Sequence, residues 1–96
     1  MNDTDVFLFR IYVAGDTQNS TRALANITAL CRIYLPNRHR IEIVDILKDP
    51  KRAAADGVLM TPTLIKIKPL PTRRFLGTLD KTDLVLQALG LENIAV

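Results

Sequence analysis

The chain has 96 residues and a net charge of +3, and 48% of its residues are apolar, so it can form the core of one small domain (residues 1–96). No apolar run approaches the roughly 20 residues that span a bilayer, and the N-terminus carries acids where a signal peptide carries bases, so we expect a cytoplasmic protein. A single cysteine excludes an intrachain disulfide, and the mild positive charge permits an acidic partner without requiring nucleic acid.

The first half of the chain predicts a strand, a helix and a second strand. Residues 7–13 are almost continuously apolar, which is typical of a strand buried on both faces. From Ala23 to Tyr34, apolar residues recur at spacings of three and four, which predicts an amphipathic helix that Pro36 ends. β-Branched residues then mark 41–46 as a strand. A strand–helix–strand opening favours parallel strands joined by a right-handed crossover, so we expect the two strands to be parallel.

The second half predicts a short helix, a hairpin and a last helix. Asp49 and Pro50 have the residue types that begin a helix. Residues 63–68 alternate as a strand does, and the short connection to residues 73–76 implies an antiparallel hairpin. Asp80 is expected to cap the last helix. The order β-α-β-α-β-β-α predicts a thioredoxin-like α/β fold.

Pro62 and Gly77 bound the predicted hairpin, and we assign both a structural role. Pro62 lies directly before a strand, where a residue without an N–H fits only at the strand's first residue or at an edge. Its place in this topology also suits a cis bond to Thr61, with a trans proline that opens an edge strand as the alternative. Gly77 ends the fourth strand.

In a thioredoxin-like fold, the loop after the first strand carries Cys-x-x-Cys at a helix N-terminus, where the dipole lowers the thiol pKa. Here that segment reads YVAGDTQNST and contains no cysteine. Cys31 lies on the predicted apolar side of the helix, so we expect a small, inert, buried side chain. His39 has no second histidine or cysteine near it to form a metal site. We therefore predict no catalytic residue, no cofactor and no metal.

Three segments in register resemble the KaiB family, small partner proteins of the cyanobacterial circadian clock. They read LFRIYVAGDTQNSTRAL, IEIVDILKDP and MTPTLIKIKPLPTRRFLG, and the match runs from about Phe7 to Leu91. The sensor domain of the clock kinase SasA shares part of the pattern but is fused to a kinase. A chain of this length favours KaiB.

The resemblance implies a binding protein and not an enzyme. KaiB docks on the N-terminal ATPase domain of the ring ATPase KaiC, and in clock organisms the complex sequesters KaiA while KaiB displaces SasA. KaiB also switches fold, since its resting tetramer has a rearranged C-terminal half and its binding state has the thioredoxin-like order. A homodimer or tetramer and the rearranged fold are therefore alternatives for this chain.

The resemblance places KaiC docking on four basic residues, namely Arg22, Lys66, Arg73 and Arg74. It places contact with KaiA at the edge of the second strand, near Arg40 and Ile41. From the residues alone, Lys66 and Lys68 share a strand face, and Arg73 and Arg74 lie on the hairpin partner. We therefore expect one basic patch, which would steer association with an acidic surface.

The last element departs from the clock pattern. Clock members have a Gly and an Asp two residues apart, where this chain has Ala88 and Gly90. Alanine favours a helix over glycine by about 1 kcal/mol, so we expect this chain to populate the thioredoxin-like order more than clock KaiB does. Gly90 either weakens that helix or caps it. The acidic tail of clock members is missing too, so a non-clock partner of a KaiC-like ATPase is a second interpretation.

Three other functions compete with that of a KaiC-binding adaptor. A redox-inactive thioredoxin-like module could bind another acidic protein. A thiol oxidoreductase conflicts with the cysteine-free loop. A nucleic-acid binder could use the Arg-rich face, but aromatics make up only 5% of the chain, and few are available to stack on bases.

Overall fold

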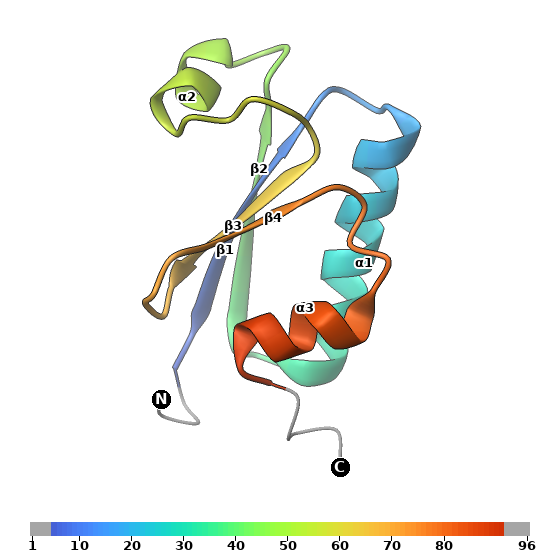
Figure 1. Cartoon of the computed structure of the whole chain (residues 1–96), viewed down its shortest axis with the longest axis vertical. Helices are drawn as coiled ribbons and strands as arrows, with labels where there is room; N and C mark the ends of the chain where they lie inside the picture. The colour runs from blue at the N-terminus through green and yellow to red at the C-terminus, as the bar shows by residue number, and fades with distance from the viewer. Residues whose placement is uncertain (1–4, 92–96) are drawn as a thin grey trace.

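The computed structural model describes residues 5–91, and these form a mixed α/β fold (Figure 1). The elements in chain order are β1 (Phe7–Val13), α1 (Gln18–Tyr34), β2 (His39–Asp45), α2 (Pro50–Ala55), β3 (Thr63–Lys68), β4 (Arg73–Leu76) and α3 (Thr82–Leu89). The predicted thioredoxin-like order is confirmed, and the C-terminal half does not take the rearranged order of the alternative.

The four strands form one sheet in the order β2-β1-β3-β4. β1 and β2 are parallel and pair from Phe7 opposite His39 to Val13 opposite Asp45, as the strand–helix–strand prediction requires. β3 is antiparallel to β1, and β4 is antiparallel to β3. β2 and β4 are therefore the two edges of the sheet.

The two faces of the sheet carry separate apolar clusters. α1 and α3 cover one face, where Phe7, Phe9 and Ile11 of β1 meet the buried sides of both helices (Figure 1). α2 covers the opposite face, where Tyr12 and Ile65 pack with residues of β2 and α2. Because β1 is buried on both faces, its near-continuous apolar sequence follows directly. Successive residues of a strand alternate between these two environments, which decides where each charged side chain lies.

The last helix begins differently from the prediction. α3 starts at Thr82, Lys81 occupies the N-cap position, and no side chain caps the helix, so the assignment of Asp80 as the cap was wrong. The Asp80 carboxylate instead accepts hydrogen bonds from Asn26 Nδ2 at 3.0 Å and from Thr78 Oγ1 at 2.9 Å. The bond from Asn26 ties the segment before α3 to α1, and a contact between residues 54 positions apart leaves no signal in the local sequence.

The four residues given structural roles lie at the ends of elements. The bond between Thr61 and Pro62 is cis, and the buried Pro62 accepts a hydrogen bond through its carbonyl from the Gly77 N–H at 3.0 Å. Ala88 lies in the last turn of α3 with its side chain exposed. Gly90 caps α3 at φ 75°, a left-handed conformation that glycine adopts without steric cost. Of the two expectations for Gly90, the helix cap is therefore confirmed.

Candidate partner-docking surface

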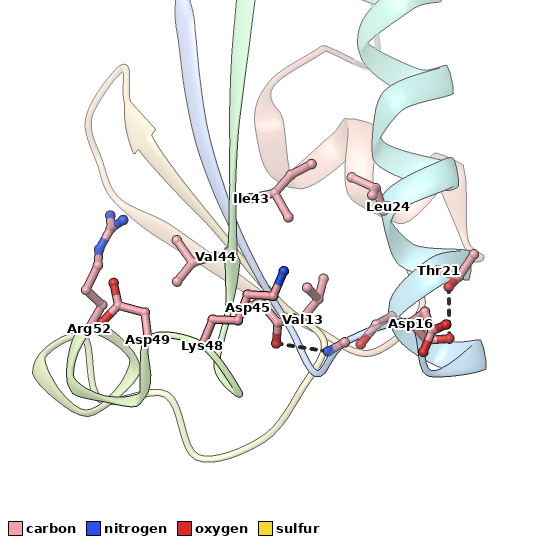
Figure 2. Close-up of a pocket in the computed structure, with 12 residues that line it drawn as sticks. Val13, Asp16, Thr21, Leu24, Ile43, Val44, Asp45, Lys48, Asp49 and Arg52 are labelled. Atoms are coloured by element: carbon pink, nitrogen blue, oxygen red, sulfur yellow. Dashed lines mark hydrogen bonds between the residues drawn. The ribbon is translucent and has the colours of Figure 1, made fainter.

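The loop between β1 and α1 is held by backbone hydrogen bonds and contains no thiol. Asp45 Oδ1 accepts from the backbone N–H of Leu47 at 2.9 Å and of Gly15 at 3.0 Å, and these bonds lower the pKa of the Asp45 carboxyl. Beside it lies an open pocket of about 550 Å³ (Figure 2). The lining mixes the acids Asp16 and Asp49 with bases of the α2 region. Within residues 5–91, no group of histidine, cysteine and acidic side chains is arranged to hold a metal ion.

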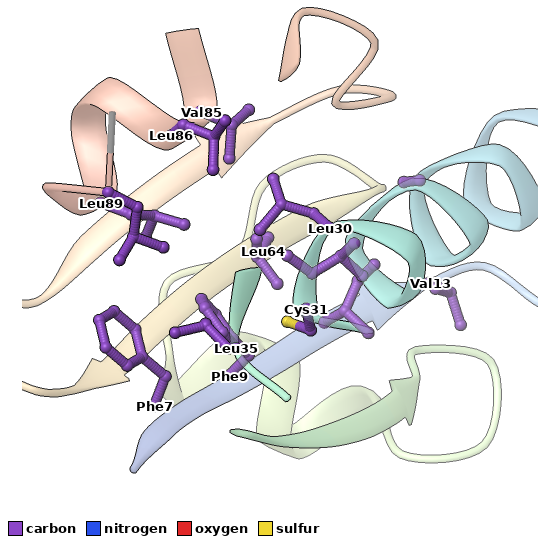
Figure 3. Packing of buried hydrophobic residues seen from close by; sticks show 14 residues of the cluster. Phe7, Phe9, Val13, Leu30, Cys31, Leu35, Leu64, Val85, Leu86 and Leu89 are labelled. Atoms are coloured by element: carbon purple, nitrogen blue, oxygen red, sulfur yellow. The ribbon is translucent and has the colours of Figure 1, made fainter. Parts of the chain in front are cut away.

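Cys31 is fully buried among the apolar residues between α1 and the sheet (Figure 3). Burial raises the pKa of its thiol to about 12, so the thiolate that would act as a nucleophile is scarce at neutral pH. The prediction of a buried structural cysteine is confirmed. The thiol also lies well inside the helix, away from the loop in which thioredoxin-like enzymes carry their cysteines.

The face under α2 carries a charge-compensated cluster that sequence reasoning missed, which we call the α2 network. It consists of Arg10, Tyr12, Glu42, Arg52 and Asp56. Arg10 Nε donates to Glu42 Oε1 at 2.7 Å, and Arg10 Nη1 donates to Asp56 Oδ2 at 2.9 Å. Arg52 Nη1 reaches Glu42 Oε2 at 2.8 Å, and the Tyr12 hydroxyl donates to the Asp56 carboxylate. Two cations therefore face two anions, and the network leaves no net charge for a partner.

The sequence did contain a signal for this network. Arg10 is the only charge inside an otherwise apolar first strand, and such a charge needs a partner when it is partly buried. Glu42 is the residue directly opposite Arg10 in the parallel register of β1 and β2. The register had to be known before the pair could be recognised.

Replacing Glu42 with glutamine is expected to lower the stability of the folded protein at neutral pH and to leave its stability in acid unchanged. Hydrogen bonds from Arg52 and Arg10 lower the pKa of the Glu42 carboxyl from its ordinary 4.5 to about 2. A carboxyl whose pKa is depressed by folding stabilises the protein above the unfolded pKa, and this contribution is lost as pH falls from about 4.5 toward 2. Urea unfolding at pH 7 and at several values between 5 and 2.5 should show a lower midpoint for Glu42→Gln at pH 7. The midpoints of the two proteins should converge in acid, and parallel curves would contradict this role.

On the opposite face, Lys66 and Arg73 lie side by side without an acidic partner. They are directly opposite each other in the β3–β4 ladder, so their side chains leave the same face of the sheet. Lys66 is only 4% exposed, and neither residue makes an ion pair or side-chain hydrogen bond within residues 5–91. Burial, and then the charge of Arg73, lower the pKa of the Lys66 ammonium. This pair of cations is held at a site where an anion would relieve an electrostatic cost.

The ammonium of Lys66 is not sealed in the core. Among the described residues, no fully buried side-chain nitrogen or oxygen lacks a hydrogen-bond partner. The Lys66 ammonium has no hydrogen-bond partner among these residues, so it cannot be one of the fully buried nitrogens. It must therefore reach the surface at the end of a buried aliphatic stem. A carboxylate from outside can therefore approach it.

The prediction that all these basic side chains form one patch is wrong for Arg74, which lies on the other face of the sheet. It stands opposite Ile65 in the ladder, which places it on the α2 face, and there its guanidinium donates to the backbone carbonyl of Asp56. Lys68 is exposed and pairs with Leu8 beyond an irregularity in the β1–β3 register. Neighbouring residues on a strand point to opposite faces, so the Arg73–Arg74 pair could not stay together.

Arg22 contacts a segment that borders a groove between β4 and α3. The groove has a volume of about 620 Å³, and Arg73 lies among its lining residues with exposed apolar side chains such as Leu76 and Leu84. Arg22 Nε lies 3.0 Å from Asp80 Oδ1, and Asp80 also lines the groove. We use "docking surface" for Lys66, Arg73 and this groove.

Arg40 and Ile41 lie apart from the docking surface, on β2 at the other edge of the sheet. Arg40 is exposed, and Ile41 is half-buried and packs against the cluster under α1. The structure therefore separates the two groups of residues that the resemblance assigned to different partners.

Known structures share this fold. The N-terminal domain of SasA from Synechococcus elongatus matches with a TM-score of 0.72 at 17% identity, covering 96% of this chain and 87% of that chain. Chloroplastic thioredoxin z matches with a TM-score of 0.75 at 16% identity, covering 93% of this chain and 80% of that chain. Sheet order, helix placement and these likenesses define a thioredoxin-like α/β protein.

The sequence relatives are more specific. The KaiB domain model matches residues 10–91. The circadian clock oscillator protein KaiB of Synechococcus elongatus is 37% identical over 91 residues, which are 95% of this chain and 89% of the relative. The circadian clock protein KaiB3 of Synechocystis is 38% identical over 90 residues, which are 94% and 86% of the two chains. The chain belongs to the KaiB family.

No helix among residues 5–91 combines the length and apolar character needed to cross a membrane.

Proposed function

We propose that this chain is a non-enzymatic adaptor that binds the N-terminal ATPase domain of a KaiC-type ring ATPase through the docking surface. Its output would be the regulation of that ATPase in a clock or in a stress response. A KaiA-type protein and a SasA-type histidine kinase are further proposed partners where a clock exists.

The observation that carries the proposal is the buried, uncompensated Lys66 beside Arg73. The α2 network neutralises its own charges, whereas this pair of cations has no acid within residues 5–91. Acidic side chains of a partner would relieve the repulsion between the two cations, and the apolar groove next to Arg73 would bury apolar side chains. Membership of the KaiB family favours a KaiC-type ATPase as the source of those acids.

The second candidate is a redox-inactive thioredoxin-like module for a different acidic protein. The same pair of cations and the cysteine-free loop support it equally. The two candidates differ only in the partner, so a binding measurement with a purified ATPase separates them.

Charge reversal at Arg73 is expected to weaken binding to the isolated N-terminal ATPase domain at least tenfold. An acid at this position would pair internally with Lys66 and repel an acidic partner. Biolayer interferometry with the immobilised ATPase domain, at two salt concentrations, measures the change. Binding of the wild type should also weaken with salt.

Lys51→Glu provides the matched control. Lys51 is an exposed lysine on α2, on the other side of the sheet, and its reversal also lowers the net charge by two. We expect its affinity to stay within twofold of wild type. Failure of the wild type to bind any KaiC-type ATPase domain would contradict the adaptor proposal. Equal losses of affinity in both variants would show that binding responds to net charge and not to the position of Arg73.

A further inference from the structure

Burial sets Lys66 apart from the other lysines of the chain. Lys66 is 4% exposed, whereas the side chains of Lys48, Lys51, Lys68 and Lys81 are all exposed. A lysine in water stays protonated at neutral pH, because its pKa is about 10.4. Burial and the charge of Arg73 both lower the pKa of the Lys66 ammonium, so its amine loses the proton more readily than a solvated lysine does.

The surroundings of the Lys66 amine supply a second cation and no anion. Phe9 and Leu64 flank its stem on the α1 face, where they are 2% and 1% exposed and belong to the apolar cluster that α3 covers (Figure 3). Arg73 lies directly opposite on β4, and the Cβ atoms of such a ladder pair are about 4.5–5.5 Å apart. Neither cation has an acidic partner within residues 5–91.

We propose that the Lys66 amine reacts reversibly with carbon dioxide and becomes a carbamate that Arg73 holds. The lone pair of the neutral amine forms a bond to the carbon atom, one C=O π bond breaks, and its electron pair moves to oxygen. The nitrogen then releases a proton to water, so an anion replaces the cation of the lysine. The product has two coplanar oxygens like a carboxylate, and a guanidinium binds such a group through two parallel hydrogen bonds.

The site favours this product over a carbamate on an exposed lysine. Burial leaves a larger fraction of the amine neutral, and only the neutral amine has a lone pair with which to attack. Carbon dioxide is small and uncharged, so it reaches an amine at the end of a buried stem without the desolvation cost that a charged reagent meets. Arg73 then stabilises the new anion in surroundings where charges interact more strongly than they do in water.

The carbamate and an acidic partner would compete for the same cations, a consequence that rests on the proposed function. Once Lys66 is an anion paired with Arg73, the docking surface no longer presents the pair of cations that attracts acids. Carbon dioxide would therefore weaken binding of the ATPase domain.

The test reads the modification on the full chain alone. The protein is equilibrated with carbon-13 bicarbonate, which supplies labelled carbon dioxide, and triethyloxonium then traps each carbamate as a stable ethyl ester. Peptide mass spectrometry locates the label. We expect the occupancy at Lys66 to be at least ten times that at any of the exposed lysines, which serve as internal controls in the same sample.

Two variants test the role of the neighbouring cation. Arg73→Gln removes the group that holds the carbamate and should lower the occupancy at Lys66 at least fivefold. Arg74→Gln is the matched control, because it removes the same charge from the same strand but from the α2 face, and it should leave the occupancy within twofold. Circular dichroism checks that both variants are folded. An unlabelled Lys66, equal labelling of all the lysines, or a label that Arg73→Gln does not reduce would overturn the proposal.

Binding to the ATPase domain is measured separately, in bicarbonate and in chloride at equal pH and ionic strength. Bicarbonate should weaken binding of the wild type at least threefold. Lys66→Arg keeps a cation but has no amine to form a carbamate, so its binding should not respond. A missing label with intact ATPase binding would overturn this proposal alone, and a labelled chain that binds no ATPase domain would contradict only the proposed function.

Discussion

Cys31 is expected to react with a thiol reagent about a thousandfold more slowly in the folded protein than in the unfolded chain. Burial raises the pKa of its thiol from the ordinary 9 to about 12. At a pH below 9, each unit by which the pKa rises lowers the thiolate fraction about tenfold. Steric exclusion acts in the same direction, because the side chain has no exposed surface. Reaction with Ellman's reagent at pH 8, followed by absorbance, measures the rate.

The control for this prediction is the same protein in concentrated guanidinium chloride, where the single thiol should react at the rate of a free cysteine. Rapid labelling of the native protein would show an accessible thiol and would reopen a redox function. Slow labelling in both conditions would point to an oxidised thiol, which mass spectrometry would detect.

Truncation of Phe9 to alanine is expected to destabilise the protein by about 3–5 kcal/mol. Phe9 is 2% exposed, stacks on Phe7 with ring centroids 6.1 Å apart, and lies in the ladder between Ile41 and Lys66. A small domain has roughly 5–15 kcal/mol of stability in total, so this single change would remove a large part of it. Guanidinium unfolding followed by circular dichroism gives the difference.

Ile33→Ala is the matched control, because Ile33 is an equally apolar residue that is 67% exposed on α1. We expect a change within about 0.5 kcal/mol for this surface position. A loss below about 1 kcal/mol for Phe9→Ala would contradict the packing described for the α1 and α3 face.

Strand and helix positions in the chain could be predicted from local pattern. The bounds of β3 and β4 agree with the prediction, because alternation and the turn residues between them are local signals. β2 begins at His39, two residues before the predicted start, since polar residues at an edge carry little strand signal. The parallel pairing of β1 and β2 was predictable from the helix that connects them, since parallel strands need a long crossover.

The candidate site was harder to predict because it depends on register and sheet order. Arg73 and Arg74 are neighbours in sequence, yet only Arg73 joins Lys66, and the alternation of the strand separates them. The α2 network joins residues up to 46 positions apart, which no local pattern reveals. From the sequence, a lysine in an alternating strand is expected to be exposed. Lys66 is buried because helices cover its face of the sheet, and the strand pattern does not reveal that cover.

The two sides of the sheet thus have different roles in this account. On the α2 side, the α2 network balances its own charges and ties α2 to the sheet. The other side keeps Lys66 and Arg73 unpaired within the described residues, beside an apolar groove. The loop between β1 and α1, which carries the redox cysteines in thioredoxin-like enzymes, is here fixed to the end of β2 by the hydrogen bond from the Gly15 N–H to the Asp45 carboxylate.

Hydrogen–deuterium exchange of the full chain, alone and with a saturating KaiC-type ATPase ring, tests the central claim most directly. The account predicts slower exchange in β4 and in the segment from Gly77 to Leu84, with no change in the loop that contains Gly15. Exchange that is unchanged throughout the chain in the presence of the ring would contradict the account, and so would protection confined to that loop.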